Sequence, residues 1–506
     1  MNNSLNSGNL ASVLDCGNPD TETYVIEVCP DGESIAYSYS DFRSQVSALA
    51  RGLCKAGYKR DDAIGIAGGN SVQFLVAYFA IMKAGMIAAP INYKLSSRVI
   101  EHIISDSDIR LVLADAMYVD EFEGLVKTHI YYNSGFGDLA DDGDFETVAM
   151  AEDDIATILY TSGSTGFPKG VPLTHGGYLW ATEVHPTRLG LKDARVLVAA
   201  PFYHMNALFQ SKIIARYGQT MVLMQQFDAY RYIESIDRHA CTNLTSVPTM
   251  LAMVLRETDA IASGDFSSVR SVGAASAPST TAMFNRLKEI FPNAVVANGY
   301  GTTESGPIAF GAHPEGLPRP AMSIGHPISE VEVRLSGGEN EDIGEMQIRN
   351  NCLTPGYLNR PEETADKFRD GWYCSGDVMQ RDENNFYFFV GRADDMFPCG
   401  GENIYPGEVE DMLETHPDIL QAAVVPVKDE LKYRLPVAFV VKKQDSNLSE
   451  NEVRRYALEN GPAYAHPRAI WFETVIPLAS TNKIDKKALE EKAGNLFDRD
   501  KVSKDI

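Results

Sequence analysis

Up to about residue 310, the chain alternates helical patterns with short apolar runs. Phe42, Val46 and Leu49 recur at helical spacing after Ser40, which we expect to cap that helix. Segment 99–115 has the pattern of a helix followed by a strand. Further buried-strand candidates are 63–67, 155–160, 196–200, 220–224, 243–247 and 294–298. Strands separated by helices predict an α/β fold class with parallel layers.

The pattern changes after about residue 320, where apolar and polar residues alternate. Segments 331–335 and 345–349 predict two antiparallel strands joined by an acidic turn over 336–344. We therefore expect a β-rich subdomain at about 320–391, inside an N-terminal domain that covers 1–391.

Beyond residue 391 the chain has the pattern of a small α+β unit. Strands are predicted at 421–427 and 436–441. Ser449 and Glu452 stand at the spacing of a capping box at the start of a helix. We predict a separate C-terminal domain over 392–506.

Charge is the main feature that composition adds to this picture. The 506 residues carry a formal net charge of -24, and a field of that sign repels nucleic acids and anionic membranes. The longest apolar run, 74–82, is too short to span a bilayer. The polar N-terminus lacks a signal-peptide pattern, and the seven cysteines include no CxxC pair. We expect a cytoplasmic protein with reduced thiols, no membrane span and no nucleic-acid partner.

The stretch 160-YTSGSTGFPKG-170 has the composition of a phosphate-binding loop. Gly163 and Gly166 let backbone amides approach a ligand, and Lys169 adds a point charge suited to phosphate. The hydroxyl donors of the loop are Thr161, Ser162, Ser164 and Thr165. The loop is not a Walker A sequence, since Pro168 prevents a helix from starting at once. On composition alone, an ordinary flexible glycine-serine loop stays open as the alternative.

This stretch resembles the phosphate loop of the adenylate-forming superfamily, which includes acyl- and aryl-CoA ligases, luciferases and peptide-synthetase adenylation domains. The resemblance recurs, in the family's order, along nearly the whole chain. The other matching segments are 201-PFYH-204, 298-NGYGTTES-305, 372-WYCSGD-377, 391-GRADDMFPCGGENIYPGEVE-410 and 481-TNKIDKKAL-489. The chain is thereby identified as a member, and membership implies ATP, Mg²⁺ and CoA as cofactors.

The resemblance implies a nucleotide site in the second half of the N-terminal domain. Tyr300 would lie on adenine, and Thr302 and Thr303 would lie near the α-phosphate. Glu304 would be the Mg²⁺ ligand, because Mg²⁺ binds through carboxylate and phosphate oxygens. The remaining backbone of the adenine slot would come from Gly273, Ala274, Ala275, Asn298, Gly299 and Gly301.

The resemblance also implies a ribose site and a hinge. Asp377 would accept hydrogen bonds from both ribose hydroxyls, and Arg392 would contact the ribose as well. Asp394 would be the hinge about which a mobile C-terminal domain rotates. That rotation would bring Gly400 and Gly401 to the site, where they let the pantetheine arm of CoA pass close to backbone.

His204 would lie at the mouth of the acyl pocket. Read from the residues alone, a satisfied core histidine is the favoured interpretation. The resemblance makes it a gate for the substrate carboxylate, and we assign no general-base role because that carboxylate is already ionised at pH 7. Met205, Asn206, Met250 and Ala274 would line the pocket and suit an uncharged aryl or short-to-medium acyl group.

Lys483 matches the catalytic lysine of the family. The glycine that usually precedes it is Asn482 here, and Asn tolerates left-handed backbone well enough to keep the local geometry. Lys486 is the rival candidate, but the continuation I-D-x-x-x-L favours Lys483. The catalytic candidates are therefore Lys483, Thr161, Glu304 and His204.

The implied reaction is ATP-dependent ligation of a carboxylic acid to a thiol. The carboxylate attacks the α-phosphorus of ATP, pyrophosphate leaves, and a thiol then displaces AMP from the acyl-adenylate. CoA is the favoured thiol, and loading of a carrier protein is the alternative. A non-catalytic nucleotide sensor is disfavoured, because Lys483 and Glu304 are both present. A homodimer is compatible with the sequence, which does not specify the oligomeric state.

Overall fold

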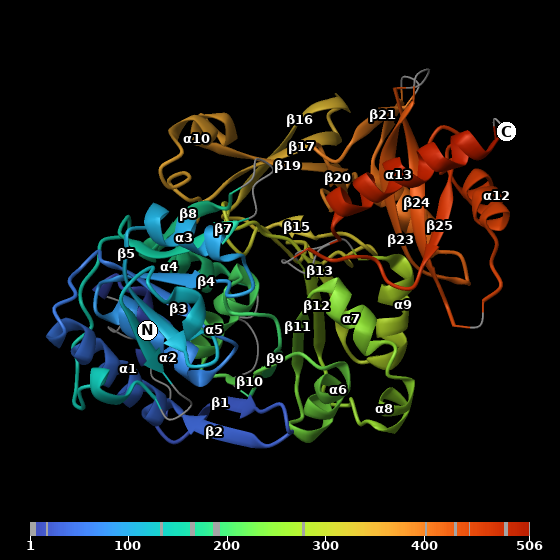
Figure 1. Ribbon diagram of the computed structural model, residues 1–506. Coiled ribbons are helices and arrows are strands. Elements are labelled where there is room, and N and C mark those ends of the chain that lie inside the picture. The colour runs from blue at the N-terminus through green and yellow to red at the C-terminus, as the bar shows by residue number, and fades with distance from the viewer. Residues whose placement is uncertain are drawn as a thin grey trace.

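The computed structural model describes most of the chain. It covers residues 7–16, 19–131, 135–161, 167–185, 193–275, 279–399, 402–429, 433–444, 446–479 and 484–504. Figure 1 shows a large α/β part, coloured blue to yellow, and a smaller orange-to-red part on the side away from the N-terminus. Two parallel-rich sheets dominate the large part, as the alternating pattern predicts.

One of these sheets has seven strands in the order β13-β12-β11-β9-β10-β1-β2. Neighbouring strands are parallel, except that β2 pairs antiparallel with β1. The strands are β1 (Thr23–Val28), β2 (Ser34–Ser38), β9 (Arg195–Val198), β10 (Thr220–Met224), β11 (Asn243–Ser246), β12 (Ser271–Ala275) and β13 (Val295–Gly299).

The other sheet has six strands in the order β6-β5-β3-β4-β7-β8. All its pairings are parallel except the last, between β7 and β8. The strands are β3 (Ala63–Ala67), β4 (Ile87–Ile91), β5 (Ile109–Asp115), β6 (Thr128–Tyr131), β7 (Ile155–Thr161) and β8 (Lys169–Thr174). The predicted strands at 63–67 and 155–160 are thus confirmed.

Helices cover the two sheets, and α2 lies in the core between them, with every residue buried. The helices of this part are α1 (Tyr39–Lys55), α2 (Val72–Lys83), α3 (Ser97–Asp106), α4 (His175–Val184), α5 (Met205–Tyr217), α6 (Ala229–Arg238), α7 (Pro248–Val254), α8 (Thr258–Ser263) and α9 (Thr281–Ile290), with short 3₁₀ helices η2 (Leu10–Asp15), η3 (Val119–Phe122) and η4 (Gly137–Leu139). Among the described helices, none has both the length and the apolar character needed to cross a bilayer.

The cap of α1 corrects a prediction from the sequence. Ser38, not Ser40, caps this helix, and Ser40 lies in its first turn. The Ser38 hydroxyl accepts a hydrogen bond from the Asp41 amide at 3.0 Å, and the Asp41 carboxylate accepts one from the Ser38 amide at 3.2 Å. The residue three positions after Ser40 is Arg43, whose side chain has no acceptor for the Ser40 amide. The capping box therefore forms at Ser38 and not at Ser40.

The predicted antiparallel region forms a five-stranded sheet with the path β16-β17-β19-β18, in which β20 pairs with β19. Its elements, with a flanking two-stranded ladder, are β14 (Phe310–Gly311), β15 (His326–Pro327), β16 (Glu332–Asn340), β17 (Ile343–Arg349), α10 (Pro361–Lys367), β18 (Phe368–Arg369), β19 (Trp372–Arg381) and β20 (Tyr387–Arg392). The turn predicted over 336–344 is longer than the turn in the structure. β16 continues to Asn340 through a register shift after Ser336, and Asn340 pairs with Ile343 of β17.

The last part of the chain has its own three-stranded sheet, β23-β24-β25. Its elements are β21 (Phe397–Cys399), β22 (Glu402–Ile404), α11 (Pro406–Glu414), β23 (Ile419–Asp429), β24 (Tyr433–Lys442), α12 (Glu450–Asn460), β25 (Ile470–Glu473) and α13 (Lys486–Lys504). The predicted capping box of Ser449 and Glu452 is confirmed at the start of α12. Two clusters of buried residues from this part pack separately from the main core.

Candidate active site

The glycine-rich stretch connects two strands of a hairpin. β7 ends at Thr161 and β8 begins at Lys169, and these two residues are direct partners across the antiparallel pair. A strand therefore follows Pro168 where a Walker A loop would continue into a helix. The predicted phosphate-loop residues Ser162, Gly163, Ser164, Thr165 and Gly166 lie outside the described residues.

Lys169 is held by residues that the sequence did not single out. Its ammonium group forms an ion pair with Glu363, in the first turn of α10. The same nitrogen lies 5.1 Å from the centre of the Tyr357 ring, within the range of a cation–π contact. The Lys169 side chain is only 14% exposed, so its charge is directed at these two neighbours.

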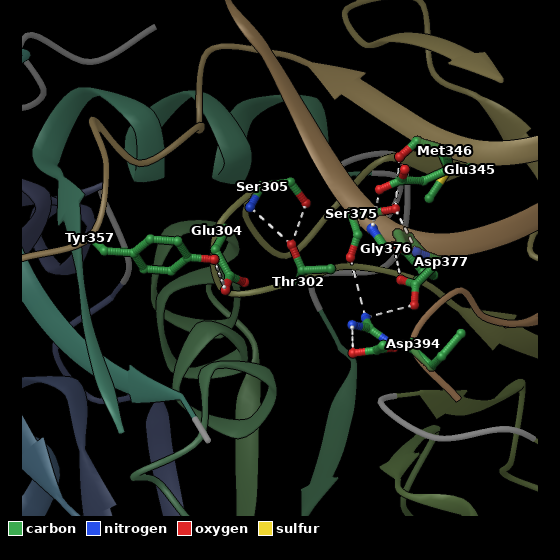
Figure 2. Close-up of polar contacts among 12 residues, drawn as sticks. Thr302, Glu304, Ser305, Glu345, Met346, Tyr357, Ser375, Gly376, Asp377 and Asp394 are labelled. Atoms are coloured by element: carbon green, nitrogen blue, oxygen red, sulfur yellow. Dashed lines mark hydrogen bonds and ion pairs between the residues drawn. The ribbon is translucent and has the colours of Figure 1, made fainter. Parts of the chain in front are cut away.

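Glu304 is bound by the other end of the same tyrosine. The Tyr357 hydroxyl donates a hydrogen bond to Glu304 Oε1 at 2.9 Å, and the Thr354 amide donates to the Glu304 carbonyl at 2.9 Å. Figure 2 shows the Tyr357 side chain reaching Glu304 from one side. Burial and the Glu304 charge raise the pKa of Tyr357 far above its ordinary value, so the hydroxyl stays the donor.

The surroundings of Glu304 fit the predicted magnesium ligand. Within the described ranges, no group of three or more His, Cys, Asp or Glu side chains could form a metal cage. Mg²⁺ does not require one, since it is commonly held by one or two carboxylates together with substrate phosphates. The half-buried Glu304, whose Oε1 is bound by Tyr357, matches that mode.

The loop that carries Glu304 is tightly closed. Thr302 Oγ1 accepts a hydrogen bond from the Ser305 amide at 3.0 Å. A side chain at Gly301 would place its Cβ 2.8 Å from the Gly306 carbonyl oxygen, so this position requires glycine. Thr303 is half-buried in the same loop. The backbone of the predicted adenine and phosphate motif is therefore closely packed at this turn.

The predicted adenine walls lie side by side at the carboxyl ends of two parallel strands. In the pairing of β12 with β13, Ala274 is opposite Asn298 and Ala275 is opposite Gly299. A Cβ at Gly299 would lie 3.1 Å from the Ala275 methyl group, so the two strands are closely packed here. Gly273 precedes them on β12. The structure brings together two segments that are separated by more than twenty residues.

Asp377, the predicted ribose ligand, is the centre of a buried polar cluster. Its carboxylate accepts a hydrogen bond from the Tyr300 hydroxyl and forms a 2.9 Å ion pair with Arg392. Burial and the Asp377 charge raise the pKa of Tyr300 well above its ordinary value, which makes the phenol the donor. Arg392 also binds both carboxylate oxygens of Asp394, at 2.9 and 3.1 Å. Burial alone would raise the pKa of Asp394, but the hydrogen bonds and charge of Arg392 hold that pKa below its usual range.

The predicted acyl-pocket residues come from three elements around one core. His204 caps α5, and Met205 and Asn206 form its first turn. Met250 lies on α7, and Ala274 lies on β12, which α7 contacts. Met250 and Ala274 are both buried in the main core. Asn206 Nδ2 is buried and has no hydrogen-bond partner among the described residues.

The predicted catalytic lysine and the pantetheine glycines are not placed. Lys483, Gly400 and Gly401 lie outside the described residues. The rival Lys486 begins α13, and its ammonium group forms a 2.8 Å ion pair with Glu410 of α11. Lys486 is therefore occupied within the C-terminal part, which agrees with the preference for Lys483.

Sequence reasoning missed Tyr357 and Glu363. Both follow β17 in the segment 356-GYLNRPEET-364, which lies outside the motif segments that carry the resemblance. A usable signal lies in the Gly-Tyr pair, since Gly356 has a φ of +140°. Such a backbone conformation favours glycine and can mark a turn that presents its neighbour to a site.

Comparisons with known proteins agree with this geometry. The chain matches the family described as AMP-binding enzyme over residues 17–358, and that described as AMP-binding enzyme C-terminal domain over residues 408–483. A feruloyl-CoA synthase of Amycolatopsis is 30% identical over 468 residues, which cover 91% of this chain and 94% of the relative. The 4-coumarate–CoA ligase 1 of Arabidopsis thaliana is 29% identical over 495 residues, covering 91% and 88%.

Solved structures show the same similarity along almost the full length. An anthranilate CoA ligase in complex with anthranoyl-AMP has a TM-score of 0.87 at 25% identity, covering 97% of this chain and 98% of that one. The o-succinylbenzoate CoA synthetase of Bacillus subtilis, in complex with its acyl-adenylate intermediate, has a TM-score of 0.83 at 27% identity, covering 95% and 98%. The chain therefore belongs to the family of AMP-binding enzymes and is an AMP-forming acid–CoA ligase.

Proposed function

We propose that this ligase activates an aryl carboxylic acid, and that the site residues predicted from the sequence perform the two half-reactions. One observation carries the assignment of the two half-reactions to these residues: a series of contacts, linked through the segment 300–304, runs from the predicted hinge to Lys169 at the end of the phosphate loop. Asp394 binds Arg392, Arg392 binds Asp377, and Asp377 binds Tyr300. The loop from Tyr300 leads to Glu304, which binds Tyr357, and Tyr357 contacts Lys169. These contacts support the proposal that the hinge, ribose, adenine, magnesium and phosphate positions form one site.

In the first half-reaction, the main requirement is positive charge around a pentavalent phosphorus, because two anions must meet. Tyr300 and the ends of β12 and β13 hold the adenine, and Asp377 orients the ribose. Lys169 and the loop amides hold the leaving pyrophosphate, and Lys483 contacts the transferred group. Glu304 would hold Mg²⁺, and the bound ion would supply positive charge to neutralise the phosphates.

In the second half-reaction, the thiol of CoA attacks the acyl carbon and AMP leaves. Rotation of the C-terminal domain about Asp394 removes Lys483 and presents Gly400 and Gly401 to the pantetheine arm. The separate cores of the C-terminal part support its movement as one body, and support domain boundaries near 391. Both the boundaries and the hinge remain proposals.

The proposal of an aryl acid rests on the lining of the pocket and on the substrates of the relatives. Met205, Met250 and Ala274 offer apolar surface without a charge. The buried Asn206 amide offers a hydrogen-bond donor to a polar substituent on the acid. The relatives are named for feruloyl, coumarate, anthranilate and succinylbenzoate groups, all of which are aryl acids. Short-to-medium acyl chains are the alternative.

The experiment is pyrophosphate release from ATP and Mg²⁺, measured over a panel of aryl and aliphatic acids with and without CoA. We expect CoA-dependent turnover to AMP and a thioester, fastest with an aryl acid. Turnover that prefers an aliphatic acid at equal CoA would contradict the aryl proposal. Adenylation that a carrier protein completes and CoA does not would instead favour carrier loading.

The remaining expectations from the sequence stay proposals. A cytoplasmic location is supported by the cysteines, all seven of which lie in the described ranges without a disulfide. The carrier-protein acceptor and the homodimer remain predictions.

A further inference from the structure

Glu363 is the carboxylate that pairs with Lys169 among the described residues, at the base of the proposed phosphate loop. Its carboxylate forms an ion pair with the Lys169 ammonium, and it lies 3.7 Å from Arg360 at the start of the same helix. The Glu363 side chain is 34% exposed and the Lys169 side chain 14%, so Glu363 is the more accessible member of this pair. An anion that arrives from solvent can therefore displace the carboxylate.

The backbone around Glu363 is anchored to the hairpin that carries the loop. The Leu358 amide donates a hydrogen bond to the Gly170 carbonyl at 2.8 Å, next to Lys169. The Tyr357 amide donates to Thr364 Oγ1 at 2.9 Å, which fixes the start of α10 against the same turn. The backbone of Glu363 is thus anchored beside the strand that carries Lys169.

Pyrophosphate and the Glu363 carboxylate are competing anions for one cation. A phosphate that binds Lys169 must share the positive charge of the lysine with the neighbouring Glu363 carboxylate. Two anions close together also repel each other. We propose that Glu363 is a resident counter-anion that occupies Lys169 between turnovers, yields it to the triphosphate, and recaptures it so that pyrophosphate leaves. This inference rests on the proposed contact between Lys169 and pyrophosphate.

Tyr357 connects this exchange to the magnesium position. Its ring faces Lys169, and its hydroxyl binds Glu304. When Lys169 moves from Glu363 towards a phosphate, the cation stays near the ring face that Tyr357 presents. The same aromatic side chain therefore holds both the metal-binding carboxylate and the lysine during the exchange.

The test is the affinity of the full-length enzyme for inorganic pyrophosphate with Mg²⁺, measured by calorimetry. Glu363→Gln removes the competing charge and keeps the size of the side chain. We expect it to bind pyrophosphate about 1.5-fold to fivefold more tightly, the range for loss of a partly exposed ion-pair partner. Product inhibition by pyrophosphate should strengthen by the same factor. A merely structural role would weaken binding instead.

Two further variants separate the causes. Glu362→Gln, at the exposed preceding position of the same helix turn, is the matched control and should leave the affinity unchanged. Lys169→Met should weaken pyrophosphate binding and abolish the effect of Glu363→Gln in the double variant. Unchanged or weaker binding in Glu363→Gln, with Lys169→Met defective, would overturn the inference alone. Unchanged binding in Lys169→Met would overturn the proposed role of Lys169 as well.

Discussion

Replacement of Asp377 by Asn tests the ribose site most directly. The Asp377 residue is only 5% exposed, and its oxygens already accept from Tyr300 and Arg392. Asn keeps the shape but loses the negative charge and one acceptor oxygen. A hydrogen bond to a buried charged group contributes about 1.5–3 kcal/mol. Loss of one such bond to the ribose predicts binding of ATP weaker by about 10- to 150-fold.

The assay compares two ligands, ATP and 2′,3′-dideoxy-ATP, by calorimetry with Mg²⁺. The wild type should prefer ATP, because only ATP offers ribose hydroxyls to the carboxylate. The variant should lose that preference by about the same factor by which it loses affinity for ATP, since its binding of the dideoxy ligand changes little.

A matched control shows whether an Asp-to-Asn change in this sheet is harmful in itself. Asp370 lies in the turn between β18 and β19 with a φ of +51°, a conformation that Asn adopts readily. Asp370→Asn should bind both nucleotides as the wild type does. Equal losses of ATP and dideoxy-ATP affinity in Asp377→Asn would refute the reasoning. They would indicate that the carboxylate positions Arg392 and does not bind the ribose hydroxyls.

Three further predictions concern the C-terminal part. Lys483→Ala should slow acid-dependent pyrophosphate exchange by about 10²–10³-fold, as expected for loss of one preorganised charge, whereas Lys486→Ala should stay within about tenfold of wild type; the reverse order would move the catalytic role to Lys486. Asp394→Pro should stiffen the hinge and slow thioester formation more than adenylate formation in single-turnover assays, and equal losses would contradict it. Burial raises the pKa of Glu414 from its usual 4.5 to about 8, so its contribution to stability is complete below about 4.5 and is lost as the pH rises from there to about 8. Glu414→Gln should therefore flatten the decline of Tm with pH that the wild type shows over this range, and an unchanged decline would contradict it.

Much of the fold follows from local sequence patterns. Strands such as 63–67 are uniformly apolar because both faces of a parallel sheet are covered, and β3 is buried at every position. The capping box of Ser449 was predictable because both partners lie within one turn. Ser38 caps α1 in place of Ser40 because Asp41, three residues after Ser38, completes the capping box.

The candidate site was predictable only where motif order supplied the long-range information. The resemblance placed Tyr300 and Asp377 in one site, and the structure joins them by a hydrogen bond across seventy-seven positions. The contacts of Lys169 with Tyr357 and Glu363 were missed, since they join segments almost two hundred residues apart. No local periodicity encodes such a pairing, which depends on how α10 packs against the hairpin.

Arg392 joins two carboxylates with one side chain. Its guanidinium binds the Asp377 carboxylate with one nitrogen and the Asp394 carboxylate with two others. If the C-terminal part rotates about Asp394 as proposed, that rotation would shift the Arg392 charge towards or away from the proposed ribose site. AMP keeps its ribose after the acyl group has gone, so its hold in that site would then depend on the position of the C-terminal part. The timing of AMP departure would be set by the proposed hinge as much as by the pocket.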